Sequence, residues 1–271
     1  IDSPGRAEID RCRFRGSSGG FYGKLADGGW IRDCQFIDLD TVYNGHSVLF
    51  YTPTSGVVVE NCEFRDCDFG VGSYWSGCTD IEIVRCTFEN AFIGVKAADG
   101  ASSTVRECSF WGQSRYAIVG ASAGSLIIED NHVDMSECTT GYCVCVYSPP
   151  GDYYLRNNTF IAAEKIIGIF DPRIEWDCRD NTFLRAGSET MYVRPANSTN
   201  YSGPVIHLDF SHNWWGTSDP DEISAWIYDY NDDQEFHYIV DFEPLNDVVA
   251  TEAHSWSAIK NLFDGDADGN K

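Results

Sequence analysis

The chain has 271 residues, of which 42 are acidic and 19 basic, and its formal charge is −23. Such a charge favours solubility and attracts cations, while it repels nucleic acid and anionic membranes, so a polyanionic partner would need bridging cations. No run of 18 or more apolar residues occurs, so no segment is predicted to span a membrane.

The first residues, IDSPGRAEID, have none of the features of a signal peptide and lead almost directly into a repeated pattern. We therefore expect a mature form or a piece of a longer protein, and the composition favours a secreted or cell-surface location. No amphipathic helix precedes the first repeat unit. An upstream domain or a second protomer, stacked head to tail, is expected to cover its strand edges.

A short phrase then recurs nine times, as DRCRF, RDCQF, ENCEF, VRCTF, RECSF, EDNHV, RNNTF, RDNTF and SHNWW. Its central residue forms a series that we call the rungs: Cys12, Cys34, Cys62, Cys86, Cys108, Asn131, Asn158, Asn181 and Asn213. An apolar residue follows each rung by two positions. Spacings of 22 to 32 residues between rungs indicate a solenoid, in which each unit buries its apolar face against its neighbours.

The repeat unit is predicted to consist of strands, because segments such as VVVENCEF and IEIVRCTF are short and rich in β-branched residues. Parallel coils about 4.8 Å apart would give nine coils a length of roughly 40 Å. The Asn rungs suit a tight turn, since Asn tolerates the left-handed backbone region and its amide can hydrogen-bond between coils.

The rung pattern resembles the I-x-x-N-x-F repeat of the large family of extracellular right-handed parallel β-helix proteins, which share the architecture of the pectate-lyase-like superfamily. The resemblance covers about residues 6–245 and implies an all-β, right-handed parallel β-helix of about nine coils with a short C-terminal capping helix. It implies an architecture and not an activity. We therefore divide the chain into a β-helix with its cap, residues 1–245, and a C-terminal extension, residues 246–271.

A second strand recurs in each coil, as HSVLFY, FGVGSY, IGVKAA, YAIVGA, YCVCVY, IGIFDP and MYVRPA. Alternation predicts that its outward residues are Leu49, Gly72, Lys96, Val119, Cys145, Phe170 and Val193. The resemblance implies that enzymes of the family place carboxylates and basic residues on this sheet. Here the predicted outward row is small or apolar with a single lysine, which favours a protein without catalytic activity.

The cysteines on the rungs are expected to be free thiols, because side chains stacked at about 4.8 Å lie too far apart for a disulfide, whose Cβ atoms are about 3.8 Å apart. Six cysteines lie off the rungs: Cys67, Cys78, Cys138, Cys143, Cys145 and Cys178. A disulfide could join Cys67 to Cys78, or Cys138 to Cys143 or Cys145, across a turn. No histidine cluster accompanies Cys143 and Cys145, which disfavours a metal site.

The segment FDPRIEWD holds the strongest candidates for catalysis, Asp171, Arg173 and Asp177, with Arg194 on the following coil. Two carboxylates and an arginine could serve a glycosidase, an esterase or a lyase. The alternative is an ion pair between Asp171 and Arg194, which follow the predicted inward position of adjacent coils by two residues.

Aromatic residues give a candidate ligand site at the ends of the second strand. Tyr51, Tyr74 and Tyr147 share one position in the repeat, and Trp75 and Trp111 lie in nearby turns. Aromatic faces stack on sugar rings, so a rod that repeats every 4.8 Å could offer a linear track for a glycan. The alternative is that these rings shield the strand ends.

The last repeat leads into NWWGTSDPDEISAWIYDYNDD and IVDFEP, which resemble the closing segment of secreted bacterial β-helix proteins. Ser218 or Asp219 can cap a helix that starts at Pro220. Ile223, Trp226 and Ile227 would form its apolar face and cover the last coil.

The chain ends in DGDADGNK, in which Asp264, Asp266 and Asp268 match positions 1, 3 and 5 of a calcium loop. It resembles the start of a dockerin-like repeat, but the later glutamate ligand is absent, and an acidic disordered tail is the alternative. Calcium is the one cofactor that the sequence suggests.

Three classes of function follow from these features. We favour a non-catalytic extracellular scaffold or adhesin, which could assemble into a surface layer or filament. A carbohydrate-binding module and a polysaccharide-active lyase or hydrolase on the same fold are the alternatives.

Overall fold

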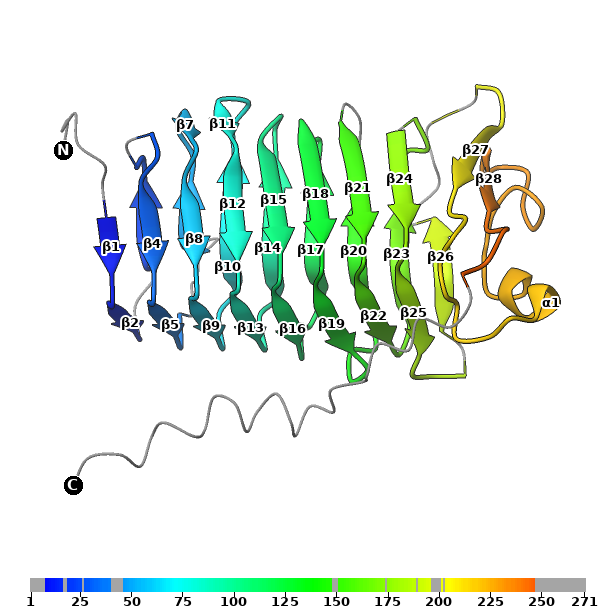
Figure 1. Cartoon of the computed structure of the whole chain (residues 1–271), viewed down its shortest axis with the longest axis horizontal. Coiled ribbons are helices and arrows are strands. Elements are labelled where there is room, and N and C mark those ends of the chain that lie inside the picture. Colours follow the sequence, from blue (N-terminus) through cyan, green and yellow to red (C-terminus); the bar gives the residue numbers. More distant parts are fainter. Residues whose placement is uncertain are drawn as a thin grey trace.

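A computed structural model of the chain describes residues 8–246 except 17–18, 26, 40–45, 148–150, 174, 189, 196–200 and 202. The chain winds into a rod of stacked coils, each of which contributes one strand to each of three parallel sheets (Figure 1). We name these sheets A, B and C in the order in which the chain first enters them.

Each sheet has eight strands, and successive coils pair in parallel register. Sheet A contains β1 (Glu8–Asp10), β4 (Trp30–Arg32), β8 (Val58–Glu60), β12 (Ile81–Val84), β15 (Ser102–Arg106), β18 (Ser125–Glu129), β21 (Asp152–Arg156) and β24 (Glu175–Arg179). Sheet B contains β2 (Arg13–Arg15), β5 (Gln35–Ile37), β9 (Glu63–Arg65), β13 (Thr87–Glu89), β16 (Ser109–Trp111), β19 (His132–Met135), β22 (Thr159–Ala162) and β25 (Thr182–Arg185). Sheet C contains β3 (Phe21–Gly23), β6 (His46–Phe50), β10 (Phe69–Tyr74), β14 (Ile93–Ala98), β17 (Tyr116–Ala121), β20 (Tyr142–Val146), β23 (Lys165–Ile169) and β26 (Met191–Pro195).

The predicted solenoid is confirmed, with eight complete coils instead of about nine. The ninth coil is reduced to β27 (Ile206–Asp209) and to two isolated bridges, from Thr182 to Trp214 and from Val193 to Ile227. β27 pairs with β28 (Tyr238–Asp241), and the short strands β7 (Thr54–Ser55) and β11 (Cys78–Thr79) pair with each other between sheets C and A.

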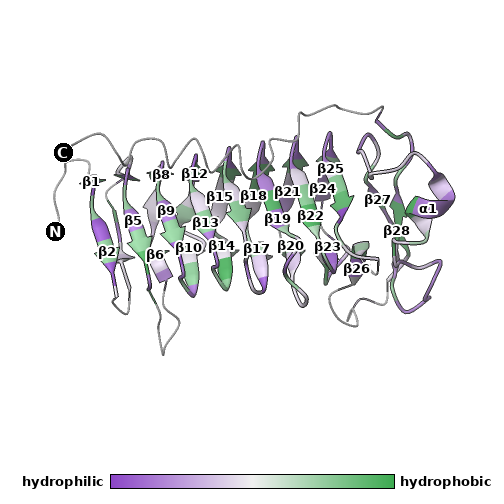
Figure 2. Cartoon of the chain, turned by 90° about the horizontal axis from the view of Figure 1, so that it is seen from below, coloured by the Kyte–Doolittle hydropathy of each residue, from purple (hydrophilic) through white to green (hydrophobic). Residues whose placement is uncertain are grey.

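Stacked rings fill the interior beside the rungs. Phe36, Phe64, Phe88 and Phe110 are fully buried, and neighbouring ring centroids lie 4.6–4.9 Å apart with planes within 5° of parallel. This spacing follows from the distance between strands in a sheet. Figure 2 shows hydrophobic residues recurring at corresponding places in successive strands.

The turn between sheets A and B differs from its prediction in one respect. The left-handed residue is the one before each rung, with φ between 50° and 59°, as at Asn61, Arg85 and Asp130. The rung itself points inward, because its side chain hydrogen-bonds to the neighbouring coils. Asn158 Nδ2, for example, donates to Ile128 O and to Asn181 Oδ1, at 2.8 and 2.9 Å.

A five-residue helix, α1 (Pro220–Ser224), lies at the C-terminal end of the rod (Figure 1). Asp219 is its N-cap, as its side chain accepts from the backbone N–H groups of Asp221 and Glu222. Ile223 and Ile227 are buried in the same core as the coils. In the part of the chain that the structure describes, no helix is long and apolar enough to cross a membrane.

All eleven cysteines are free thiols, so the disulfides considered for Cys67 with Cys78 and for Cys138 with Cys143 or Cys145 are not formed. The thiols of Cys67 and Cys78 face carbonyl groups on different sheets of the second coil, at Phe36 in sheet B and Phe50 in sheet C. Ten of the eleven are buried, and Cys12 is exposed.

We expect one thiol, Cys12, to react with an aromatic disulfide reagent in the native protein at neutral pH. Burial raises the pKa of Cys34 to about 11 and also raises that of Cys78, so these thiols are both shielded and protonated. Counting modified thiols before and after unfolding in guanidinium checks this, with eleven expected in the unfolded chain. Several fast-reacting native thiols would show that the rungs open readily.

Candidate binding faces

The outer face of sheet C differs from its prediction over the last two coils. Strand pairing aligns Tyr22, Leu49, Gly72, Lys96, Val119, Cys145, Gly168 and Arg194 in one outward row. Val193 is instead buried in the core, and Phe170 lies two residues beyond Gly168. The predicted row failed there because Ile167, and not Ile169, pairs with Val144. The row therefore carries two cations, Lys96 and Arg194.

Much of the apolar surface on this face is covered by its own aromatic rings. Ile93, Tyr116, Val119, Tyr142 and Cys145 form a second, small buried cluster outside the coils, flanked by Phe69, Tyr147 and Phe170. The hydroxyls of Tyr116 and Tyr147 hydrogen-bond to each other, and the rings of Tyr147 and Phe170 stack at 4.1 Å. Tyr147 is thus mainly a packing residue.

Three polar side chains, one each from the second, third and fourth coils, contact one another on the same face. His46 Nε2 is 2.8 Å from Tyr74 Oη, and the ammonium of Lys96 lies 4.6 Å from the Tyr74 ring centroid. Gly72 makes room for this arrangement, since a Cβ there would lie 2.5 Å from the His46 ring. Burial lowers the pKa of Lys96 and raises that of Tyr74, so both side chains are partly withdrawn from water.

The exposed large hydrophobic residues among those described are all aromatic and belong to this sheet or its adjoining turns. Tyr22 is 67% exposed, Trp75 54% and Tyr51 40%, and Phe92 is the fourth. The rings of Tyr22 and Tyr51 stack with centroids 4.2 Å apart. We call Tyr22, Tyr51, Tyr74 and Trp75 the aromatic strip. Three of the five predicted aromatic residues belong to it.

Two predicted aromatic residues lie elsewhere, and two exposed ones were not predicted. Tyr147 is packed three coils away from Tyr74, and Trp111 lies on sheet B. Tyr22 was missed because the first coil contributes only the short strand FYG, which lacks the repeat's usual pattern. Phe92 lies in the turn before β14, where the repeat places no ring elsewhere.

Several cations on or beside sheet C lack the ion pairs that Arg85 and Arg106 form beside sheet A, although Lys165 of β23 pairs with Glu164. Arg85 bridges Glu60 and Glu107, and Arg106 contacts Glu82 and Glu107. Lys96, Arg115 and Arg194 form no ion pair with any residue in the described ranges. The Arg115 guanidinium lies instead 5.4 and 5.1 Å from the ring centroids of Phe92 and Tyr116.

The residues predicted for catalysis do not converge. Asp171 pairs with Arg173 at 2.6 Å, and this arginine lowers the pKa of the carboxyl group. The proposed pair of Asp171 with Arg194 is wrong, because Arg194 lies opposite Gly168. Asp177 belongs to β24 of sheet A, where it pairs with Arg156 and Arg179. Two sets of ion pairs, one in the turn after β23 and one on sheet A, therefore account for Asp171, Arg173 and Asp177.

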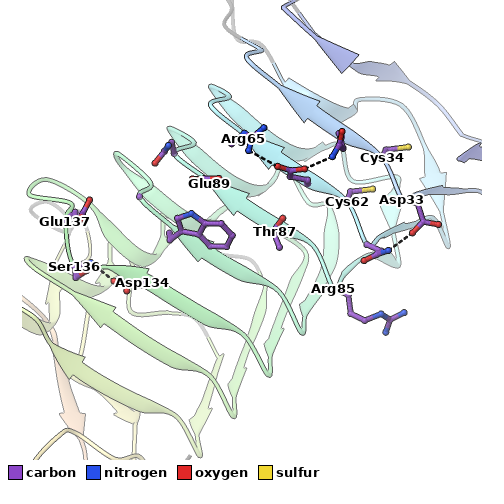
Figure 3. A pocket seen from close by; sticks show the side chains of 16 residues that line it. Asp33, Cys34, Cys62, Arg65, Arg85, Thr87, Glu89, Asp134, Ser136 and Glu137 are labelled. Carbon is purple, nitrogen blue, oxygen red and sulfur yellow. Dashed lines mark hydrogen bonds and ion pairs between the residues drawn. The ribbon is translucent and has the colours of Figure 1, made fainter. Parts of the chain in front are cut away.

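A hollow lies over sheet B and has a volume of about 790 Å³ (Figure 3). Its lining is polar and includes Gln35, Glu63, Arg65, Thr87, Glu89, Trp111, Asp134 and Glu137. We call it the sheet B groove. Trp111 was predicted to lie near the strand-end tyrosines. It lies instead in the sheet B groove, among carboxylates and on a different sheet from the aromatic strip.

No group of three or more His, Cys, Asp or Glu side chains in the described part of the chain could hold a metal ion. Asp264, Asp266 and Asp268, the predicted calcium ligands, lie outside the described residues. The described faces thus offer ring stacking, hydrogen bonding and charge, with no assembled metal centre.

Comparison with known proteins gives one match. The family described as "Right handed beta helix region" matches residues 1–160, more than half of the chain. No curated protein and no solved structure matches significantly. With the parallel coils and stacked rungs described above, this match establishes that the chain belongs to the right-handed β-helix family.

Proposed function

We propose that this protein is a non-catalytic extracellular β-helix scaffold that binds an acidic polysaccharide along the outer face of sheet C. The observation that carries the proposal is that the largely exposed aromatic strip shares one face with Lys96 and Arg194, which form no ion pair with any described residue. Pyranose rings stack on aromatic faces, and carboxylate or sulfate groups pair with Lys and Arg.

The arrangement of the strip suits a linear polymer. Tyr51 and Tyr74 occupy one position on neighbouring coils, and Tyr22 stacks on Tyr51 from the first coil. Lys96 continues the series on the fourth coil, beside Tyr74. A chain laid parallel to the rod would meet rings first and charges next, at intervals of about 4.8 Å.

The amino-acid content of sheet C supports binding without hydrolysis. None of its eight strands, as bounded above, contains an aspartate or a glutamate. Hydrolysis of a glycosidic bond ordinarily uses two carboxyl groups that flank it. The negative charge of the whole chain opposes a polyanion at long range, so calcium that bridges protein and polymer would strengthen binding.

Replacing both Tyr51 and Trp75 by alanine is expected to weaken binding of an acidic polysaccharide by about tenfold or more, as two stacking contacts are lost. Titration calorimetry with polygalacturonate, alginate and a neutral glucan, each with and without calcium, measures this. Trp111→Ala on sheet B is the matched aromatic control and should leave the affinity unchanged.

Lys96→Ala tests the charge requirement, with Arg13→Ala as its control, since Arg13 is an exposed cation on sheet B. Lys96→Ala should selectively weaken the binding of acidic polymers, and Arg13→Ala should leave that binding unchanged. Equal affinity for neutral and acidic polymers would show that the cations do not contribute to binding. Release of reducing ends during incubation would contradict a non-catalytic role.

Head-to-tail assembly is a second candidate, favoured by the state of the first coil. Ile9, Phe14 and Phe21 are only half buried, whereas Phe36 and Phe64 in the same stack are fully buried. A second copy seated on this coil would bury these residues. Light scattering over a range of concentrations tests it, and a strictly monomeric protein at the highest concentration would contradict it.

A further inference from the structure

The sheet B groove contains a tryptophan between two carboxylates. Strand pairing aligns Glu89 of β13 with Trp111 of β16, and Trp111 with Asp134 of β19. The three side chains therefore point outward from successive coils, about 4.8 Å apart. All three line the groove and are half-buried. The turn that follows Trp111 requires a glycine, because Gly112 takes φ +68° and a Cβ there would meet the Asn90 side chain.

The two carboxylates are free to meet a positive ligand. Neither Glu89 nor Asp134 forms an ion pair with any residue in the described ranges. Arg65, aligned with Glu89 on the other side, is 3.3 Å from Glu63 and 4.0 Å from Asp66. Asp134 accepts one hydrogen bond, from the backbone N–H of Ser136 at 2.9 Å. Glu137 adds a further exposed carboxylate at the rim.

We propose that the sheet B groove binds a polysaccharide of amino sugars that carry free ammonium groups. A pyranose ring would stack on the Trp111 indole, and ammonium groups on either side would pair with Glu89 and Asp134. Gln35 and Thr87, which also line the groove, supply hydrogen-bonding groups for sugar hydroxyls.

Two other occupants fit the groove less well. An extended basic peptide gains its affinity by adding to a free sheet edge, but the strands on the groove floor are paired on both sides. A divalent ion needs several oxygen ligands at one point, whereas Glu89 and Asp134 lie two coils apart with Trp111 between them. The flat indole between separated carboxylates favours a ring polymer that carries spaced positive charges.

This site is independent of the acidic polysaccharide proposed for sheet C. Sheets B and C are different faces of the coil, so a single rod could bind a polyanion and a polycation at once. Such a rod would link two polymers of opposite charge.

The test is titration calorimetry of the full chain with a glucosamine oligomer, its fully N-acetylated counterpart and a lysine oligomer of equal length, at low and high salt. We expect the glucosamine oligomer to bind best, and Glu89→Gln and Trp111→Ala each to weaken it by about tenfold. Glu89→Gln is isosteric and lies on the surface, so it separates lost binding from lost folding.

Asp152→Asn is the matched control, because it removes one exposed carboxylate from sheet A. It should leave the affinity unchanged. Equal losses of affinity for Asp152→Asn and Glu89→Gln would show that the oligomer is attracted by net charge alone, and would overturn the proposed site. Equal binding of the acetylated or the lysine oligomer would overturn the assignment to an amino-sugar polymer.

Discussion

Replacing Phe88 by alanine is expected to lower the free energy of unfolding by about 3–5 kcal/mol, the range found for large core aromatic residues. Phe88 is fully buried, and its ring stacks on Phe64 at 4.8 Å and on Phe110 at 4.6 Å. Its removal would leave a cavity between two rings that backbone pairing holds in place. The neighbouring rings cannot close the gap, since β13 stays paired with the strands on both sides.

Equilibrium unfolding in guanidinium, followed by far-ultraviolet circular dichroism, measures this loss. Phe92→Ala is the matched control, because Phe92 is 37% exposed in the turn that follows Phe88 by four residues. Its effect should stay within about 0.5 kcal/mol, the usual range for surface positions. A loss below about 1 kcal/mol for Phe88→Ala would show that the stack tolerates a missing ring and that the interior is loosely packed.

The rung pattern predicted the architecture because each rung and its apolar partner lie at equivalent places in every coil. The pairing of Phe36 with Phe64, and of Phe64 with Phe88, keeps the register that the sequence spacing indicates. Sheets A and B are tied to this pattern within a few residues of each rung. Their positions could therefore be predicted with little error.

Sheet C was harder to predict, since variable turns separate it from the rungs. Asn158 is followed by Lys165 of β23 after seven residues, and Asn131 by Tyr142 of β20 after eleven. The apolar pattern alone aligns Ile169 with Val144, whereas Ile167 is the residue that pairs with it. Both residues are buried and apolar, so hydrophobicity alone could not choose between them.

The sheet B groove could have been predicted from the rungs. Glu89, Trp111 and Asp134 each follow a rung by three residues, at Cys86, Cys108 and Asn131. Residues three positions after successive rungs must lie side by side on the outside of sheet B. The sequence does not show whether the carboxylates of Glu89 and Asp134 are ion-paired, because the partners of the neighbouring Arg65 depend on side-chain conformation.

The rungs also explain how cysteine and asparagine share one role. Each rung after Cys12 donates to a carbonyl group on the preceding coil, at 3.5 Å from the Cys108 thiol to Ile83 O and 2.9 Å from Asn131 Nδ2 to Val105 O. Rungs of both kinds also accept from the backbone N–H of the preceding rung, as Cys108 Sγ does from Cys86 at 3.4 Å and Asn131 Oδ1 does from Cys108 at 2.9 Å. Sulfur makes the same contacts at greater length, and hence more weakly.

Replacing Asn158 by leucine, which has a similar shape, is expected to cost about 3 kcal/mol or more, since it leaves several buried polar groups without partners. Asn158 Oδ1 accepts from both the backbone N–H and the side-chain amide of Asn131, at 3.0 and 2.9 Å. Its own amide donates to Ile128 O and Asn181 Oδ1. Asn158 is 1% exposed, so water cannot replace these bonds.

Cysteine at the same rungs gives the sharper comparison, because Asn131 borders Cys108 while Asn158 has asparagine on both sides. Asn131 makes three of the side-chain hydrogen bonds given above and Asn158 makes four. We expect Asn158→Cys to be more destabilising than Asn131→Cys. Both should cost less than Asn158→Leu, because the thiol keeps a weak donor and acceptor in place. The unfolding midpoints of the three variants in guanidinium give the order. If Asn158→Leu proved as stable as Asn158→Cys, the rungs would act through shape alone, and their hydrogen bonds would not hold the coils in register.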